Sequence, residues 1–198
     1  MVIGITGGIG CGKSTFSKML SEALNAPILD ADKISHEAFS SNEILIEMCN
    51  FLGDDILDSN GNIDKAKVAN IVFLDKDKLK KLNSIIHPYV MKKIRERINS
   101  LSKKYSYIII DVPLPNDDFI RLSDHIINIW ADLETRIERL QKRSGFTREA
   151  IMARISKQMT QSEYEALANT VIYNNGNIED LESKLKEVKM KLLKKHTW

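Results

Sequence analysis

Residues 7–14 read GGIGCGKS, and this stretch decides the fold. It fits the phosphate-binding pattern G-x-x-x-x-G-K-[ST] at every fixed position. The β-branched apolar run at 2–6 predicts a buried strand before it, and a helical pattern begins at Lys13. A strand, a glycine-rich loop and a helix in this order predict a loop that wraps the phosphates of a nucleotide.

Each fixed residue of the loop has its own physical task. The glycines let the backbone curl so that N–H groups point at phosphate oxygens, and the helix turns its positive N-terminus toward the same anion. Lys13 places a positive charge near the β- and γ-phosphates, and the Ser14 hydroxyl is a ligand for Mg²⁺. The ATP-binding residues expected in this segment are Gly8, Gly10, Cys11, Gly12, Lys13, Ser14 and Thr15.

Apolar runs alternate with helical patterns along the chain, which predicts a three-layer α/β fold with a central parallel sheet. Further strands are expected at 27–29, 107–112, 124–130 and 171–172. Helices are expected from Lys13 to Leu24, at 132–143 and 148–159, and from Ile178 to Leu192. The long helical stretch at 33–104, broken near 58–62 and at Pro88, indicates an inserted helical lobe.

The composition limits the class of protein. A chain of 198 residues, 43% hydrophobic and 28% charged, predicts one folded globular domain. Its net charge of +2 does not indicate nucleic-acid binding. Cys11 and Cys49 make neither a disulfide framework nor a zinc site. With no signal peptide and no run near ~18 apolar residues, we expect a cytoplasmic monomer without a membrane or nucleic-acid partner.

The phosphate loop occurs in small-molecule kinases, regulatory GTPases and motor or transport ATPases. A dinucleotide-binding loop is excluded, because its third glycine would fall where Lys13 stands. The segment after the strand at 107–112 lacks the glycine of an Asp-x-x-Gly switch, and the sequence has no Asn-Lys-x-Asp guanine reader. Motor ATPases are usually larger, so the chain length favours a small kinase.

A kinase also needs a group that orients or deprotonates the acceptor hydroxyl. Asp30 and Asp32 follow the second predicted strand, and the carboxyl ends of strands line the ligand crevice of an open α/β sheet. One of these acids is therefore a candidate base. The alternative is that Asp32 caps the following helix, and the spacing alone leaves both interpretations open.

A basic cluster follows the fourth predicted strand. Arg136, Arg139 and Arg143 share one face of a predicted helix, and residues 136–157 hold seven basic against two acidic residues. Arg154 and Gln158 fall one helical turn apart. We interpret the cluster as a cationic lid over ATP, and the alternative is a solvated helix face.

Two further features indicate local structure only. Residues 58–62 resemble part of a calcium loop, but Ile56 and Lys67 occupy positions that would have to be ligands, so a turn is predicted. His87-Pro88 suggests a helix break with a buried histidine.

The sequence resembles the dephospho-coenzyme A kinases nearly from end to end. The resemblance is carried by ITGGIGCGKST at 5–15, DADKISHE at 30–37, HP at 87–88, RLQKRSGFTREAIMARISKQM at 139–159 and VIYNNGNIEDL at 171–181. Many families share the phosphate loop. The Asp-Ala-Asp, the His-Pro and the Arg-x-x-x-Arg…Arg-x-x-x-Gln pattern are much more specific.

The resemblance implies ATP-dependent phosphorylation of the ribose 3′-hydroxyl of dephospho-CoA, the last step of coenzyme A synthesis. It implies a P-loop NTPase fold with a core (about 1–32, 105–135 and 168–198), an acceptor-binding helical lobe (33–104) and a lid (136–167). Asp32 matches the proposed base, and we expect Lys13 and Arg143 to act with it. Arg139, Arg143 and Asn174 are expected to complete the ATP site. The expected acceptor contacts are Asp32, His87, Asp117, Arg154 and Gln158.

The chain departs from the family pattern at two places. Residues 113–117 read PLPND where relatives tend to read Pro-Leu-Leu-x-Glu, so Asp117 is one methylene shorter and Pro115 stiffens the loop. Cys11 stands where serine is commoner. We expect a reactive thiolate there because a helix N-terminus and Lys13 favour it, and the alternative is a packed, inert thiol. Two alternatives stay open: a related kinase of a nucleotide or sugar acid, and an ATP-switched binding protein without turnover.

Overall fold

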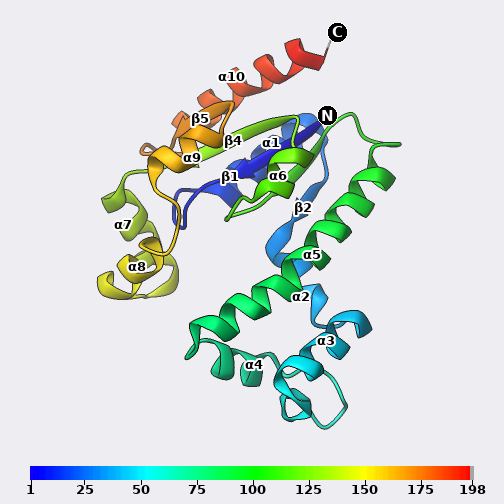
Figure 1. The fold of residues 1–198 in the computed structure, drawn as a ribbon. Coiled ribbons are helices and arrows are strands. Elements are labelled where there is room, and N and C mark those ends of the chain that lie inside the picture. The colour runs from blue at the N-terminus through cyan, green and yellow to red at the C-terminus, as the bar shows by residue number, and fades with distance from the viewer. Residues whose placement is uncertain (197–198) are drawn as a thin grey trace. The chain divides into compact units, whose positions relative to one another are not determined.

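A computed structural model gives the fold and describes the backbone of residues 1–196 and the side chains of residues 1–194. Five parallel strands form one sheet in the order β2-β3-β1-β4-β5 (Figure 1). They are β1 (Val2–Thr6), β2 (Ile28–Asp30), β3 (Ile108–Asp111), β4 (His125–Trp130) and β5 (Thr170–Tyr173). The predicted α/β class and all five predicted strands are confirmed, with ends that differ by at most one residue.

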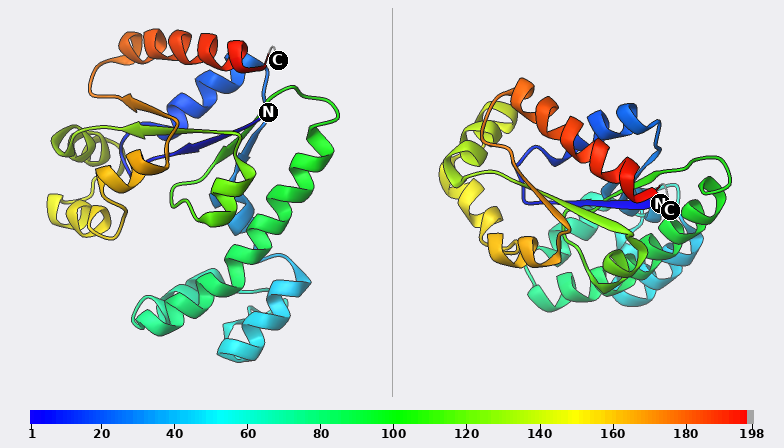
Figure 2. Two further views of the ribbon diagram at one scale, coloured as in Figure 1. Left: turned by 45° about the horizontal axis from the view of Figure 1, so that its top comes forward. Right: turned by 90° about the horizontal axis from the view of Figure 1, so that it is seen from above.

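Helices cover both faces of the sheet and complete three layers. On one face, α1 (Lys13–Leu24) and α10 (Ile178–His196) lie side by side (Figure 2). Their apolar stripes pack against alternate residues of β1 and β4 in the main core, which includes Ile3, Ile5, Phe16, Leu20, Ile127, Leu181, Val188 and Leu192. The other face carries α6 (Asp117–Leu122) on β1 and α9 (Gln161–Leu167) on β4. Both faces of the central strands are therefore buried, as their uninterrupted apolar runs predict.

The chain divides into two compact units. One contains residues 1–30 and 97–198 and holds the sheet. The other, residues 31–96, is helical and buries its own apolar residues, among them Ile34, Ile44, Met48 and Val68. It contains α2 (Ala31–Ala38), α3 (Asn42–Leu52), a 3₁₀ turn at Asp54–Ile56, α4 (Lys65–Val72) and most of α5 (Lys76–Leu101).

Helix α5 continues without a break through Pro88, so the helix break expected there is wrong. An internal proline removes one hydrogen bond and costs about 3 kcal/mol. Ile85, Ile86, Val90 and Met91 are buried on both sides of it, and their packing offsets this cost. The histidine beside Pro88 is exposed rather than buried.

The segment after β4 holds α7 (Leu133–Ser144) and α8 (Arg148–Ile155). Helix α8 ends four residues earlier than expected, because the N–H groups of Lys157 and Gln158 bond back three residues in a tight turn. Gln158 therefore lies beyond the helix, and the expectation that it stands one helical turn from Arg154 is wrong. The short helices α6 and α9 are not anticipated by the hydrophobic pattern.

The predicted turn at 58–62 is confirmed, since Asp58 Oδ1 accepts the N–H groups of both Asn60 and Asn62 at 2.9 Å. Among the described residues, no helix is both long enough and apolar enough to cross a membrane.

Candidate active site

The phosphate loop joins β1 to α1, and its backbone at Gly10 and Gly12 has conformations that favour glycine. Gly10 and Gly12 have φ angles of 82° and 91°, in the left-handed region where a side chain is strained. A Cβ atom on Gly12 would lie 2.3 Å from the Asn174 side chain, and one on Gly8 would lie 2.5 Å from Arg136. Backbone shape and close packing both require the glycines of the motif.

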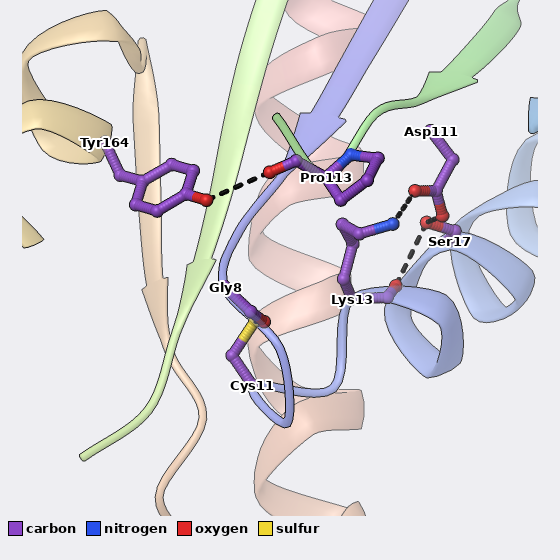
Figure 3. Close-up of polar contacts among 7 residues, drawn as sticks. All are labelled: Gly8, Cys11, Lys13, Ser17, Asp111, Pro113 and Tyr164. Carbon is purple, nitrogen blue, oxygen red and sulfur yellow. Dashed lines mark hydrogen bonds and ion pairs between the residues drawn. The ribbon is translucent and has the colours of Figure 1, made fainter. Parts of the chain in front are cut away.

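Lys13 opens α1, and its Nζ forms an ion pair with Oδ1 of Asp111, the last residue of β3 (Figure 3). The other carboxylate oxygen of Asp111 accepts a hydrogen bond of 2.8 Å from Ser17 Oγ. Asp111 is only 5% exposed, so its charge depends on these partners. Lys13 is therefore held by the protein itself and does not point into an empty site.

Asp111 is the functional candidate that sequence reasoning missed. In the sequence, Asp111 is visible only as the acid that begins a segment without the glycine of a GTPase switch. The available signal was a single acid at the end of an otherwise apolar strand, because the carboxyl ends of the strands form the ligand-binding edge of such a sheet.

Ser14 and Thr15 lie exposed in the first turn of α1. The Ser14 hydroxyl and the Asp111 carboxylate are hard oxygen ligands of the kind that Mg²⁺ takes. The described part of the chain holds no cluster of three or more His, Cys, Asp or Glu residues that forms a metal cage. This donor set fits a Mg²⁺ ion that is held mainly by nucleotide phosphates and by one or two protein oxygens.

Cys11 is fully buried inside the loop, and its Sγ donates to the Gly8 carbonyl oxygen at 2.6 Å (Figure 3). Burial raises the pKa of the thiol and outweighs the opposing effects of Arg136 and Lys13. The expectation of a reactive thiolate is therefore wrong, because desolvation dominates over the positive groups nearby.

We expect Cys11 to resist alkylation in the native protein. Iodoacetamide should modify the partly exposed Cys49 first, and MgATP should not alter the slow reaction of Cys11, since burial sets its rate. Peptide mapping by mass spectrometry follows both sites. Faster labelling of Cys11 than of Cys49 would contradict this picture.

Asn174, which follows β5, supports the phosphate loop, and Arg139 of α7 holds the segment around Asn174. Asn174 is buried, and its Nδ2 donates to the Cys11 carbonyl oxygen at 2.8 Å. Arg139 donates to the carbonyl oxygens of Asn174 and Gly176 at 2.9 and 3.2 Å. The structure thus brings together the two residues expected at the nucleotide and the phosphate loop.

Ile9 is held by two side chains from the segment after β4. Arg136 Nε donates to its carbonyl oxygen at 2.8 Å, and Gln158 Oε1 accepts its N–H at 2.9 Å. Gln158 Oε1 also accepts from Arg136 at 3.1 Å. Gln158, expected at the acceptor, therefore contacts the phosphate loop. Arg136 was not distinguished from Arg139 and Arg143 because all three share one helix face.

The loop that departs from the family pattern is anchored at both ends. The Tyr164 hydroxyl donates to the Pro113 carbonyl oxygen at 2.9 Å (Figure 3), and burial raises the pKa of Tyr164 to about 12. At the other end, Asn116 Oδ1 caps α6 by accepting the Phe119 N–H at 2.9 Å. Asp117 is the exposed first residue of α6.

Two of the predicted lid residues are exposed. Arg143 lies in the last turn of α7, and the Arg154 guanidinium stacks 4.1 Å from the centroid of the Phe146 ring. In the described part of the chain neither makes a hydrogen bond or ion pair with the phosphate loop.

Asp32 and His87 belong to the helical unit. Helix α2 begins at Ala31, so Asp32 lies inside its first turn and does not precede it. The alternative that Asp32 is the N-cap is therefore wrong. The exposed His87 lies within α5.

Comparisons with known proteins agree with this architecture. The family model described as dephospho-CoA kinase matches residues 1–180. A dephospho-CoA kinase of Carboxydothermus hydrogenoformans is 38% identical over 200 residues, covering 100% of this chain and 95% of the relative. One of Fusobacterium nucleatum is 40% identical over 186 residues, covering 93% and 95%.

A solved dephospho-CoA kinase from Campylobacter jejuni superposes with a TM-score of 0.74 at 26% identity and covers 99% of this chain and 98% of its own. The similarity therefore extends over the sheet, the phosphate loop and the helical segments alike. The chain belongs to the dephospho-CoA kinase family.

Proposed function

We propose that this protein transfers the γ-phosphoryl group of MgATP to the ribose 3′-hydroxyl of dephospho-CoA. The reaction takes place beside the carboxyl ends of β1 and β3. As a member of its family, the protein is a dephospho-CoA kinase and acts in coenzyme A synthesis. The observation that carries the proposed site is the pairing of Lys13 with the buried Asp111 beside the glycine loop.

On the donor side, ATP offers Lys13 a new set of anionic oxygens. Lys13 leaves Asp111 for the β- and γ-phosphates, while loop N–H groups bind the remaining oxygens. Asp111 and the Ser14 hydroxyl are then placed to hold Mg²⁺, which when bound neutralises phosphate charge. Arg139 and Asn174 keep the loop shape that receives the nucleotide.

On the acceptor side, Asp32 accepts the proton of the 3′-hydroxyl, and His87, Asp117 and Arg154 bind dephospho-CoA. These roles rest on the match between this sequence and the family motifs. The exposed Arg143 closes over the transferring phosphoryl group as part of the lid. We also propose that the protein acts as a monomer, which light scattering after gel filtration tests.

Replacing Arg143 with alanine should lower kcat about 10²-fold and change KM for ATP much less. An arginine that acts on the transferring group contributes most when charge shifts in the transition state. Steady-state kinetics measure both constants. Lys142→Ala is the matched control, because it removes an exposed neighbouring charge from the same helix turn. A raised KM with an unchanged kcat would assign Arg143 to ground-state binding instead.

The function is tested by ADP release from ATP with dephospho-CoA, nucleoside monophosphates and gluconate offered separately. We expect rapid release with dephospho-CoA alone. Faster turnover of a nucleotide or of gluconate would favour a related kinase. ATP binding without ADP release in any mixture would favour an ATP-switched binding protein.

A further inference from the structure

Arg136 is a buried cation whose contacts are all electrically neutral. The residue is 3% exposed and lies in the first turn of α7. It donates to the Ile9 carbonyl oxygen and to Gln158 Oε1, and its guanidinium lies 5.0 Å from the centroid of the Trp130 ring. In the part of the chain that the structure describes, no carboxylate forms an ion pair with it.

A buried charge without a counter-ion is costly, and proteins usually pair it. Burial lowers the pKa of Arg136, but a guanidinium stays protonated in proteins. The nucleotide-free protein therefore holds an uncompensated positive charge beside its phosphate loop.

The position of this charge identifies what compensates it. A Cβ atom built on Gly8 would lie 2.5 Å from an Arg136 nitrogen, so the guanidinium rests directly against the loop backbone. The loop N–H groups proposed to bind the phosphates belong to this same backbone. Arg136 also donates a hydrogen bond to the Ile9 carbonyl oxygen, and its positive charge offsets the partial negative charge of that oxygen.

We propose that Arg136 is the buried counter-charge of the polyphosphate: a positioning residue that strengthens anion binding through the loop without touching the phosphates. The inference rests on the proposed binding of MgATP at this loop. It assigns to Arg136 a role distinct from that of the exposed Arg143, which acts on the transferring group.

Two substitutions at Arg136 separate the effect of its charge from the effect of its hydrogen-bonding geometry. Arg136→Gln keeps a hydrogen-bond donor but removes the charge, whereas Arg136→Lys keeps the charge and loses the two-point contact. We expect the Gln variant to bind MgATP and inorganic pyrophosphate about ten- to a hundredfold more weakly, the scale of one charge at low effective dielectric. The Lys variant should stay within about threefold of the wild type. Lys142→Gln, which removes an exposed charge from α7, should bind both ligands normally.

A third variant places a carboxylate on the buried cation. Gln158→Glu keeps an acceptor for the Ile9 N–H and faces Arg136, so it should raise the melting temperature of the nucleotide-free protein. The same change should weaken pyrophosphate binding, because the charge is now compensated internally. These opposite effects are not expected from a residue that only supports the fold, since loss of support lowers stability and affinity together.

Isothermal titration calorimetry with MgATP and with pyrophosphate, and thermal melts without ligand, give the readouts. Wild-type affinity for both ligands in Arg136→Gln, or equal losses in the Gln and Lys variants, would overturn the inference. Tighter pyrophosphate binding by the Gln158→Glu variant than by the wild type would also overturn the inference. A wild-type protein that binds MgATP but does not phosphorylate dephospho-CoA would refute the proposed function. The comparison of ligand affinities among the Arg136 and Gln158 variants would still test the role of Arg136.

Discussion

Lys13→Ala should abolish turnover and also destabilise the fold. The lysine carries the positive charge nearest the β- and γ-phosphates in the proposed site, and losing such electrostatic stabilisation costs at least about 10²–10³-fold in rate. The loss of fold stability follows from the contacts of Lys13 in the structure. Without Lys13, the buried Asp111 keeps only its hydrogen bond from Ser17, and removing one partner of a buried ion pair costs about 3–5 kcal/mol.

A double variant separates the two effects. Lys13→Ala combined with Asp111→Asn removes both charges, so the melting temperature should recover while the activity stays absent. Coupled ADP-release assays and thermal melts of the single and double variants measure this. A Lys13→Ala enzyme with a wild-type rate would remove Lys13 from the chemistry, and an unchanged melting temperature would show that Asp111 does not depend on it.

Asp32→Asn should lose turnover while it keeps its melting temperature and its affinity for ATP. Asp32 lies in the first turn of α2, where the helix dipole favours a negative charge by about 0.3–1 kcal/mol. An asparagine cannot take the proton of the 3′-hydroxyl, and general-base contributions are about 10²–10⁴-fold. The lower end is expected, because a loose phosphoryl-transfer transition state depends less on a base.

Asp30→Asn is the matched control, two residues away at the end of β2. It should change kcat much less than Asp32→Asn, since the family motif matches Asp32 as the base. Single-turnover rates with saturating ATP report the chemical step for both variants. Equal losses at the two positions would mean that the assignment between the two acids is wrong, and no loss at Asp32 would leave it without a catalytic role.

The sheet and the phosphate loop could be predicted because their signals are local. Each strand is a short apolar run, and both faces of the central strands are buried. The glycine pattern requires a particular backbone shape, which Gly10 and Gly12 adopt. The helix propensity of a residue does not include the stabilisation that comes from tertiary packing. The continuation of α5 through Pro88 could therefore not be predicted from the sequence.

The site depends on contacts between residues far apart in the sequence, and this limited its prediction. Lys13 and Asp111 are separated by 98 positions. A lysine and an aspartate this far apart in the sequence give no sign that they form an ion pair. Lys13 and Arg136 do favour a thiolate at Cys11, but burial has the larger effect and raises the pKa of the thiol. Burial of a residue in a glycine-rich loop cannot be read from the sequence. The basic cluster was visible, whereas the distinction between the buried Arg136 and the exposed Arg143 required the packing of α7 on the loop.

The identity of the product tests the central claim most directly. The protein is incubated with MgATP and dephospho-CoA, and the products are followed by ³¹P nuclear magnetic resonance and mass spectrometry. We predict one equivalent of ADP for each equivalent of coenzyme A, with the new phosphate on the ribose 3′-oxygen. Release of ADP with inorganic phosphate and unmodified dephospho-CoA, or a phosphate at another position, would contradict it.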